Sequence, residues 1–150
     1  MDIKLYRNGH LSTPEPVRKH ENDVGADVYA VTDAVIPAHG SLRYNLGFGI
    51  ELPTGFVGLI YPRSGMTAKG IGMELPPIDP GYTGDIHAIL VNHTDADYPI
   101  KTGDRIGQLL VQSVITPNFV FMTDEEEAAA KQKIEAAGAR GNNGFGSTGK

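Results

Sequence analysis

The sequence predicts an all-β domain of the jelly-roll type, a β-barrel or sandwich that carries one short C-terminal helix and a flexible C-terminal arm. Three observations support this fold class. The chain has 19 glycines, 10 prolines and no tryptophan in 150 residues, short β-like runs alternate with turn signals, and a helical pattern occurs once. Strands spaced this way are typical of sandwiches and jelly rolls. The length suits one domain with a real core.

The expected strands are short apolar or alternating runs bounded by Pro and Gly where turn geometry favours them. In chain order they are residues 3–6, 26–31, 41–50, 56–61, 86–91, 105–114 and 119–122. Residues 106–114 carry apolar side chains on both faces. That pattern predicts a strand covered on two sides, within the fold or by another subunit.

The expected helix covers residues 124–137. Thr123 is suited to cap it, Glu126 completes a capping box, and Gly138 is suited to end it. Ile134 is its only large apolar residue, so we expect the helix on the surface. The predicted organisation is a single domain with a β core at 1–123, a surface helix and linker at 124–138, and an arm at 139–150.

Composition excludes several classes of function. Without Cys the chain has no disulfide scaffold, thiolate zinc site or cysteine nucleophile. Its net charge of −5 would repel a nucleic-acid backbone, so no direct nucleic-acid binding is expected. The N-terminal residues lack the apolar region of a signal peptide, and no apolar run has the length of a membrane span. We therefore expect no membrane association and a soluble protein, cytoplasmic or otherwise intracellular.

The glycine-rich arm pairs phosphate-binding chemistry with a backbone that cannot fold by itself. Arg140 offers a planar fork for phosphate, Phe145 a face for a base, Gly146 a permissive backbone and Ser147 a hydroxyl. Ordering costs ~1 to 2 kcal/mol per residue, so the arm should become ordered only on a ligand. Residues 144–149 also match a dinucleotide-binding glycine pattern, but the required helix cannot follow. A disordered polar tail is the alternative.

A tight turn presents a carboxylate beside an aromatic ring. In Ile78-Asp79-Pro80-Gly81-Tyr82, Pro followed by Gly specifies a type II turn, which makes Asp79 and Tyr82 neighbours in space. A carboxylate on a rigid turn can orient and deprotonate a water, and the ring can pack on a sugar. The alternative is that the Asp merely begins the turn.

A second candidate site follows an apolar strand at Tyr61-Pro-Arg63-Ser64-Gly65, where a guanidinium, a hydroxyl and a permissive backbone occur together. This pattern indicates an anion cradle or an ordinary turn. Because the net charge is negative, a phosphorylated ligand would need such local cations, and the candidates are Arg63, Lys69, Arg105 and Arg140.

Several polar residues have competing interpretations. Asp27 lies within a β run, where Asp is disfavoured unless its side chain has a specific partner. A structural hydrogen bond is preferred over a metal-water contact as that partner. Asp104 and Arg105 are expected to form a structural ion pair, and Gln108 stays open as a phosphate donor. The group His93, Asp95 and Asp97 is expected to be a solvated loop, because it lacks the features of a calcium loop.

Taken in order, these motifs resemble the five motifs of the trimeric dUTPase family. They are Gly25-Ala-Asp27-Val, Pro62-Arg-Ser-Gly65, Ile78-Asp-Pro-Gly-Tyr82, Gly103-Asp-Arg-Ile-Gly-Gln108 and Arg140-Gly-x-x-Gly-Phe-Gly-Ser-Thr-Gly149. The resemblance spans almost the whole chain, and five patterns in one order are far more specific than any one of them.

The resemblance implies a homotrimer of jelly rolls with composite active sites at subunit interfaces, closed by the C-terminal arms. It implies Mg²⁺-assisted hydrolysis of dUTP to dUMP and pyrophosphate, which limits uracil incorporation into DNA and supplies dUMP for thymidylate synthesis. Asp79 is implied as the general base and Asp27 as a water-bridged metal ligand. The implied substrate-binding residues are Arg63, Ser64, Gly65, Leu75, Pro77, Ile78, Tyr82, His87, Gln108, Arg140, Phe145, Gly146 and Ser147.

The chain departs from the family pattern in two places. Residues 70–78 are shorter than the usual uracil hairpin and lack its Asn, so backbone groups at 75–78 are expected to read the base. The helix at 124–137 extends the usual linker to the arm. Two rival functions follow: a dCTP deaminase, which would need a Glu where Ile89 stands, and a dUTP-sensing regulator that contacts a protein partner through that helix.

Overall fold

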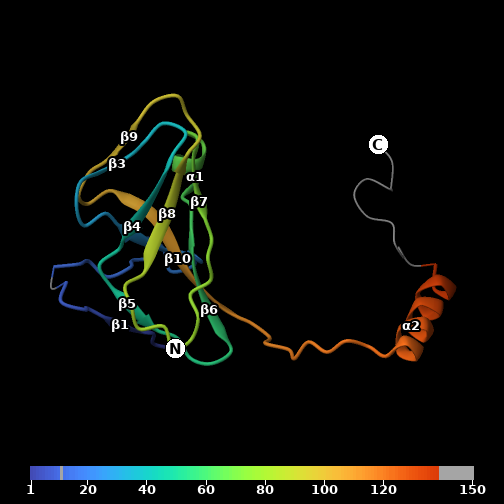
Figure 1. The fold of residues 1–150 in the computed structure, drawn as a ribbon. Helices are drawn as coiled ribbons and strands as arrows, with labels where there is room; N and C mark the ends of the chain where they lie inside the picture. The colour runs from blue at the N-terminus through green and yellow to red at the C-terminus, as the bar shows by residue number, and fades with distance from the viewer. Residues whose placement is uncertain (11, 139–150) are drawn as a thin grey trace. The chain divides into compact units, whose positions relative to one another are not determined.

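The computed structural model describes residues 1–10 and 12–138, and these divide into two compact units (Figure 1). The first is a β domain from Met1 to Ile115, and the second begins at Thr116 and contains one helix. The predicted boundary between core and helix, at residue 123, stays a prediction.

The β domain has ten short strands and one helical turn. Their bounds are β1 Lys4–Tyr6, β2 Ala26–Tyr29, β3 Ala34–Ile36, β4 Ser41–Asn45, β5 Gly49–Glu51, β6 Phe56–Tyr61, α1 Ser64–Thr67, β7 Ile71–Glu74, β8 His87–Asn92, β9 Tyr98–Ile100 and β10 Arg105–Ser113.

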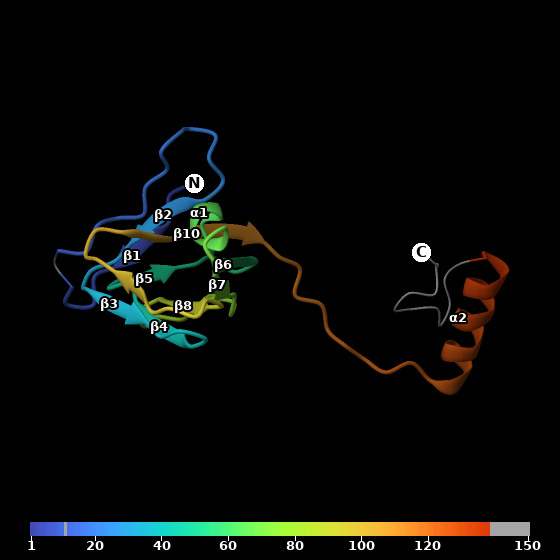
Figure 2. The ribbon, with the colours of Figure 1, turned by 90° about the horizontal axis from the view of Figure 1, so that it is seen from above.

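The strands form two three-stranded sheets and two strand pairs, all antiparallel. The sheet orders are β2-β10-β6 and β4-β8-β7, and the pairs are β1-β5 and β3-β9. Figure 2 shows the two three-stranded sheets as facing layers. The predicted all-β, jelly-roll-like class is confirmed.

The core lies between these layers and is built from alternate residues of the strands. In β8, Ala88, Leu90 and Asn92 are buried while the residues between them are partly exposed. Ile60 of β6 and Leu109 of β10 lie opposite each other and are buried too. Alternation of this kind gives each strand one core face, and it leaves the other face of β2-β10-β6 available for a site.

The predicted strand at 41–50 is two strands, so that prediction is wrong in its extent. The chain turns at Gly47, which has a φ of +73° and donates its N–H to the Asn45 Oδ1 at 2.7 Å. Asn side chains favour such local turns, and glycine adopts the left-handed backbone without steric cost. Of the other six predicted runs, five form strands, namely β1, β2, β6, β8 and β10.

The exception is the run at 119–122, which forms no strand, and that prediction is wrong. Its four apolar residues, Phe119, Val120, Phe121 and Met122, are 60% to 104% exposed. A strand needs a hydrogen-bonded neighbour, and none of the described strands pairs with this segment. These four apolar side chains are therefore exposed to solvent, and their backbone forms no strand pair with the described residues.

The predicted helix is confirmed as α2, Asp124–Ala136. Thr123 accepts from the Glu126 backbone N–H while the Glu126 carboxylate accepts from the Thr123 N–H, which is the predicted capping box. Lys131 pairs with Glu127 one turn earlier. No residue of the helix is buried, as expected for a surface helix.

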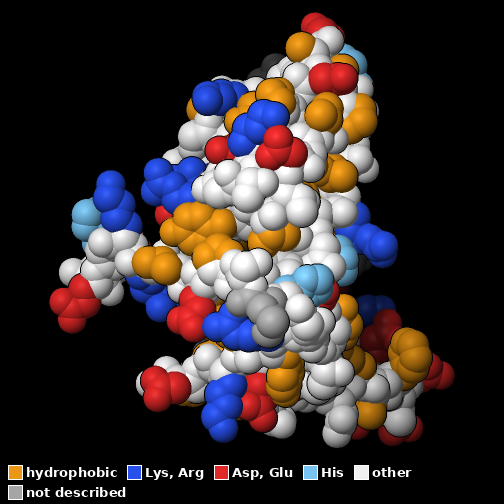
Figure 3. All heavy atoms as spheres, turned by 90° about the vertical axis from the view of Figure 1, so that its left-hand side faces the viewer, with side chains coloured by type: hydrophobic (Ala, Val, Ile, Leu, Met, Phe, Trp, Pro, Cys, Tyr) orange, Lys and Arg blue, Asp and Glu red, His pale blue; other side chains and the backbone are white. Residues whose placement is uncertain are grey.

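On the face drawn in Figure 3, basic and acidic side chains are interspersed. No helix in residues 1–10 and 12–138 has the length and apolar character needed to cross a membrane.

Candidate active site

The register of the β2-β10-β6 sheet brings three of the predicted site segments together. Gln108 of β10 lies opposite Asp27 of β2 on one side and opposite Tyr61 of β6 on the other. Directly opposed residues of antiparallel strands point to the same face. All three are partly exposed, whereas their neighbours along the strands contribute to the core. Asp27 and Gln108 therefore share the outer face, and β6 leads directly to Arg63.

Asp27 is the electrostatic centre of this face. Its Oδ1 pairs with the Arg63 Nε at 3.1 Å and its Oδ2 with an Arg105 guanidinium nitrogen at 3.2 Å. The Asp side chain is 15% exposed, so its charge is held by two hydrogen-bonded cations as a partly buried carboxylate requires. The preferred interpretation of Asp27 as a structural residue is thus supported by direct contacts.

The predicted ion pair between Asp104 and Arg105 is wrong. The Asp104 carboxylate accepts from the Lys101 backbone N–H at 2.8 Å and closes the turn before β10. Arg105 instead crosses to Asp27 on the neighbouring strand. Short polar side chains readily hydrogen-bond to nearby backbone groups. The Asp104 carboxylate therefore accepts from the Lys101 N–H instead of pairing with its sequence neighbour Arg105.

Asp27, Arg63, Arg105 and Gln108 line an open cavity of about 390 Å³. We call it the phosphate pocket, after the phosphate binding predicted for its residues. Its described lining residues are Lys19, Asp23, Val24, Gly25, Asp27, Arg63, Ser64, Arg105 and Gln108. Lys19 was not singled out from the sequence, because it lies in a loop with no motif. Gly65 lines the adjoining cavity, which shares Arg63 and Arg105 with this one.

Gly25 leaves the space that Gln108 occupies. A Cβ at this position would lie 2.4 Å from the Gln108 Oε1 and 2.8 Å from its Cβ. Gly25→Ala should therefore displace Gln108, weaken pyrophosphate binding, and lower the free energy of unfolding by about 1 to 3 kcal/mol, as overpacking does. Denaturant unfolding and titration with inorganic pyrophosphate measure both effects.

Gly72→Ala is the matched control, because its Cβ would meet the flexible ring of His93 at 3.1 Å. If Gly25→Ala leaves both the unfolding free energy and pyrophosphate binding at their wild-type values, Gly25 does not set the position of Gln108.

The predicted type II turn is present at Asp79–Tyr82. Gly81 has a φ of +85°, and the Tyr82 N–H donates to the Asp79 carbonyl at 3.2 Å. The preceding Ile78 makes a two-bond bridge with Gly58 of β6, at 2.9 and 3.0 Å. The bridge to β6 therefore anchors the start of the turn, and Asp79 and Tyr82 are both exposed.

The ring of Tyr82 lies against Gly84. A Cβ on Gly84 would come within 2.8 Å of the Tyr82 Cζ, so glycine is required there for the ring to occupy its place. The Tyr82 hydroxyl donates to the Asp85 carbonyl at 3.0 Å. The His87 Nδ1 lies 3.0 Å from the same carbonyl, so it must carry a proton to donate to it.

These side chains line a second cavity of about 230 Å³, which we call the turn pocket. Its described lining residues are Ile60, Glu74, Pro76, Pro77, Ile78, Asp79, Tyr82, Asp85, Ile86, His87 and Ile89. Four of the predicted substrate-binding residues, Pro77, Ile78, Tyr82 and His87, are brought together here. Leu75 is 40% exposed and is not among the lining residues.

The phosphate pocket and the turn pocket have no described lining residue in common. The structure of one chain therefore brings Asp27, Arg63 and Gln108 together, and separately brings Asp79 and Tyr82 together. Four predicted arm residues, Arg140, Phe145, Gly146 and Ser147, lie outside the described residues.

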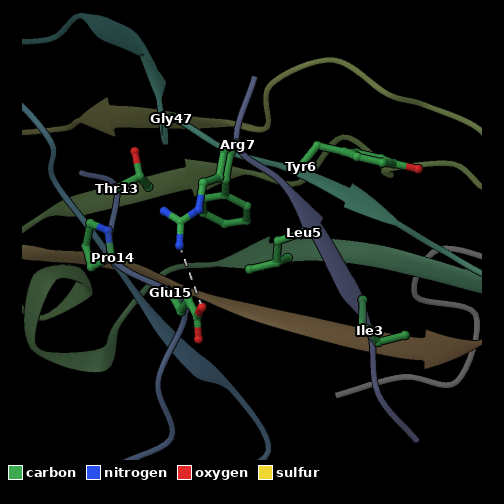
Figure 4. Close-up of a pocket in the computed structure, with 9 residues that line it drawn as sticks. Ile3, Leu5, Tyr6, Arg7, Thr13, Pro14, Glu15 and Gly47 are labelled. Atoms are coloured by element: carbon green, nitrogen blue, oxygen red, sulfur yellow. Dashed lines mark ion pairs between the residues drawn. The ribbon is translucent and has the colours of Figure 1, made fainter. Parts of the chain in front are cut away.

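A fourth cavity, beside β1, has none of the predicted site residues among its described lining residues. It holds about 220 Å³, and Figure 4 shows Arg7 extending toward Glu15 across it. Those two charged groups are 4.0 Å apart.

The predicted solvated loop at residues 93–97 bonds to the loop at residues 38–39. Asp95 pairs with His39 at 2.7 Å, and Asp97 accepts from the Ala38 N–H. The described residues contain no cluster suited to hold a metal by three side chains.

Comparisons with known proteins bear on this arrangement. The family model for dUTPase matches residues 12–149. The deoxyuridine 5'-triphosphate nucleotidohydrolase of Paramecium bursaria Chlorella virus 1 is 40% identical over 139 residues, 92% of each chain. The probable deoxyuridine 5'-triphosphate nucleotidohydrolase of Schizosaccharomyces pombe is 35% identical over 135 residues, 89% of each chain.

The fold is also found in a solved structure. A dUTPase G164S mutant of Staphylococcus bacteriophage 80alpha, in complex with dUpNHpp, matches with a TM-score of 0.82 and 22% identity over 99% of each chain. At that identity the likeness concerns the fold. The family model and the virus and yeast relatives carry the assignment: this chain belongs to the dUTPase family.

Proposed function

We propose that this protein is a dUTP diphosphatase, which hydrolyses dUTP to dUMP and pyrophosphate. The observation that carries the proposal is the rigid Asp79–Tyr82 turn, which presents a carboxylate and an aromatic ring at one cavity. The relatives named as deoxyuridine 5'-triphosphate nucleotidohydrolases support it, since they align over about nine tenths of the chain.

Asp79 is the general base in this proposal. Its carboxylate takes a proton from a water, the water oxygen forms a bond to the α-phosphorus, and the bond to the oxygen that bridges the α- and β-phosphates breaks. The products are dUMP and pyrophosphate. The type II turn and the bridge between Ile78 and Gly58 supply the fixed orientation that a positioned base needs.

Tyr82 is the platform for the deoxyribose. Its ring is fixed by Gly84 behind it and by the hydroxyl bond to the Asp85 carbonyl. A sugar packed on this face would have no room for a 2′-hydroxyl. The backbone at Leu75, Pro77 and Ile78 reads the uracil, and Phe145 of the arm stacks on it.

The phosphate pocket holds the triphosphate. Arg63, Ser64, Gly65 and Gln108 contact the phosphates, and Arg140, Gly146 and Ser147 of the arm clamp the γ end. Lys19 adds a cation that the motifs had not identified.

Asp27 fits a water-bridged Mg²⁺. Proteins hold this ion through one or two carboxylates, several waters and the substrate phosphates, and Asp27 places one carboxylate in the phosphate pocket. When bound, the ion would neutralise charge on the phosphates. To hold the ion through its waters, the Asp27 carboxylate would loosen its pairs with Arg63 and Arg105, and a triphosphate would offer those guanidinium groups an alternative anion.

The site is composite, formed between subunits of a homotrimer. The phosphate pocket and the turn pocket of one chain have separate linings, which supports a site that combines one pocket from each of two chains. Two surfaces could take part in such an assembly. They are the partly exposed outer face of β10 and the exposed apolar residues 119–122.

The decisive experiment measures pyrophosphate release from dUTP, UTP, dTTP and dCTP in the presence of Mg²⁺. Selective cleavage of dUTP is the expected result. Equal cleavage of all four nucleotides would contradict the specificity, and ammonia release from dCTP would identify a deaminase instead.

A regulatory contact through the 124–137 helix and an intracellular location are further parts of the proposal. The described helix has no buried residue and carries four acidic residues in its first turn. Deleting it while preserving the reach of the arm should leave hydrolysis intact and abolish binding of any such partner.

A further inference from the structure

Three side chains from distant parts of the chain converge on the carboxylate of Asp85. The Asn8 Nδ2 donates to its Oδ1 at 2.9 Å, and the Asn45 Nδ2 and the His10 Nε2 reach its Oδ2 at 2.8 Å each. Because an ionised carboxylate only accepts, His10 donates through Nε2–H. The Asp85 side chain is 16% exposed, so this is a partly buried, fully engaged carboxylate.

The ionised form of Asp85 is favoured by these contacts. Hydrogen bonds from Asn45 and Asn8 hold the pKa of the Asp85 carboxyl below its ordinary value, with a further contribution from His10 and against the opposing effect of partial burial. Asp85 is therefore negatively charged at neutral pH, and all three donors keep their acceptor.

The N-terminal turn is shaped to reach Asp85. Asn8 has a φ of +45° and Gly9 a φ of +89°, and the His10 N–H closes the turn on the Arg7 carbonyl at 2.7 Å. Asn is the side-chain-bearing residue that tolerates this left-handed backbone best. In this conformation the Asn8 amide also donates to the Thr83 carbonyl at 3.2 Å, so one turn holds two successive points of the 83–85 segment.

The backbone carbonyl of Asp85 connects these side-chain contacts to Tyr82. It accepts the Tyr82 hydroxyl and the His87 Nδ1–H, at 3.0 Å each. Residues 79–85 form a loop between two backbone anchors. Ile78 is bridged to Gly58, and the Ile86 N–H donates to the Phe48 carbonyl at 2.8 Å. Within this loop, the Asp85 carboxylate accepts hydrogen bonds from three other side chains.

We propose that Asp85 is a positioning residue for sugar selectivity: its carboxylate, gripped by Asn8, His10 and Asn45, fixes the carbonyl that holds the Tyr82 ring. This inference rests on the proposed role of Tyr82 as the platform that excludes a 2′-hydroxyl. Discrimination between dUTP and UTP then depends on Asn8, His10 and Asn45, none of which is among the described lining residues of the turn pocket. A ring free to tilt away from Gly84 would make room for the ribose.

The first test compares kcat/KM for dUTP with that for UTP. Tyr82→Phe keeps the ring and removes its bond to Asp85, and should lower the dUTP/UTP ratio about fivefold, the effect of one hydrogen bond. Asp85→Ala releases all three side-chain donors and should lower the ratio by about tenfold or more. The loss should come mainly from improved use of UTP.

A rescue experiment separates positioning from general destabilisation. Asp85→Asn places an amide group opposite the Asn45 and His10 donors and should lower the ratio. Asn45→Asp reverses the Asn45 bond: the new carboxylate accepts from the amide at 85 and still accepts the Gly47 N–H. The double variant Asp85→Asn with Asn45→Asp should recover most of the wild-type ratio.

The matched control is Asp33→Asn. Asp33 also accepts three hydrogen bonds, from the Lys101 Nζ and from the Thr102 N–H and hydroxyl, and it lies on a different loop. This variant should lose thermal stability without changing the dUTP/UTP ratio.

The outcomes distinguish the inference from the proposed function. Wild-type protein that fails to hydrolyse dUTP would overturn the function and, with it, the premise of the inference. If the protein selects dUTP and Tyr82→Ala abolishes the selection, while Tyr82→Phe and folded Asp85 variants keep the wild-type ratio, the role of Asp85 is wrong and the function stands.

Discussion

Replacing Asp79 by Asn should slow dUTP hydrolysis by ~100-fold or more, the scale of a lost general base, while leaving dUTP binding largely intact. The amide has the shape of the carboxylate but cannot accept the proton of the attacking water. The turn should be unchanged, because it is closed by the Tyr82 N–H on the Asp79 carbonyl and shaped by Gly81, two backbone features that do not use the side chain at 79.

Single-turnover pyrophosphate release measures the chemical step, and calorimetric titration with a non-hydrolysable dUTP analogue measures binding. Asp95→Asn serves as the matched substitution, since Asp95 is fully exposed and pairs with His39 on another loop. Turnover of Asp79→Asn within a few-fold of the wild type would refute the assignment of the base. Loss of analogue binding would mean that the carboxylate acts in the ground state.

The parts of the site that could be predicted are those encoded by adjacent residues. A type II turn needs Pro and Gly at neighbouring positions, so Asp79 and Tyr82 could be placed together from five residues of sequence. The capping box of α2 is equally local, with Thr123 and Glu126 three residues apart.

The parts that could not be predicted depend on residues far apart in the chain. Arg105 turns from Asp104 to Asp27, 78 residues away, because β10 pairs with β2. The donors to Asp85 come from 77, 75 and 40 residues away, and the first two lie in an N-terminal turn whose residues carry no motif. Only the strand pairing and the folded loops create these contacts, and one sequence does not reveal the pairing.

The missed strands have a similar cause. β3, β7 and β9 are three or four residues long, and β9 contains Pro99. A period of two cannot be recognised over so few residues, and Pro argues against a strand except at an edge. β9 pairs with β3 alone, in a two-stranded sheet where an edge proline is tolerated.

Mixing two inactive variants should restore activity if the active site is built from two chains. Arg63→Ala removes a guanidinium from the phosphate pocket, and Asp27 keeps its pair with Arg105 at 3.2 Å, so the sheet should stay folded. Asp79→Asn disables the turn pocket and leaves the phosphate pocket intact. Each variant alone should form trimers without effective hydrolysis, because every site in such a trimer carries the same defect.

In a closed ring of three subunits, each site would combine the phosphate pocket of one subunit with the turn of the next. Any ring that contains both variants then has one site in which both halves are wild type. After equal mixing with full subunit exchange about three quarters of the rings are mixed, so about a quarter of the wild-type activity should return. Mass-tagged subunits report the exchange, and pyrophosphate release reports the activity. Mixed trimers that stay inactive would show that each chain uses its own two pockets, since both variants keep their arms and no other defect separates them.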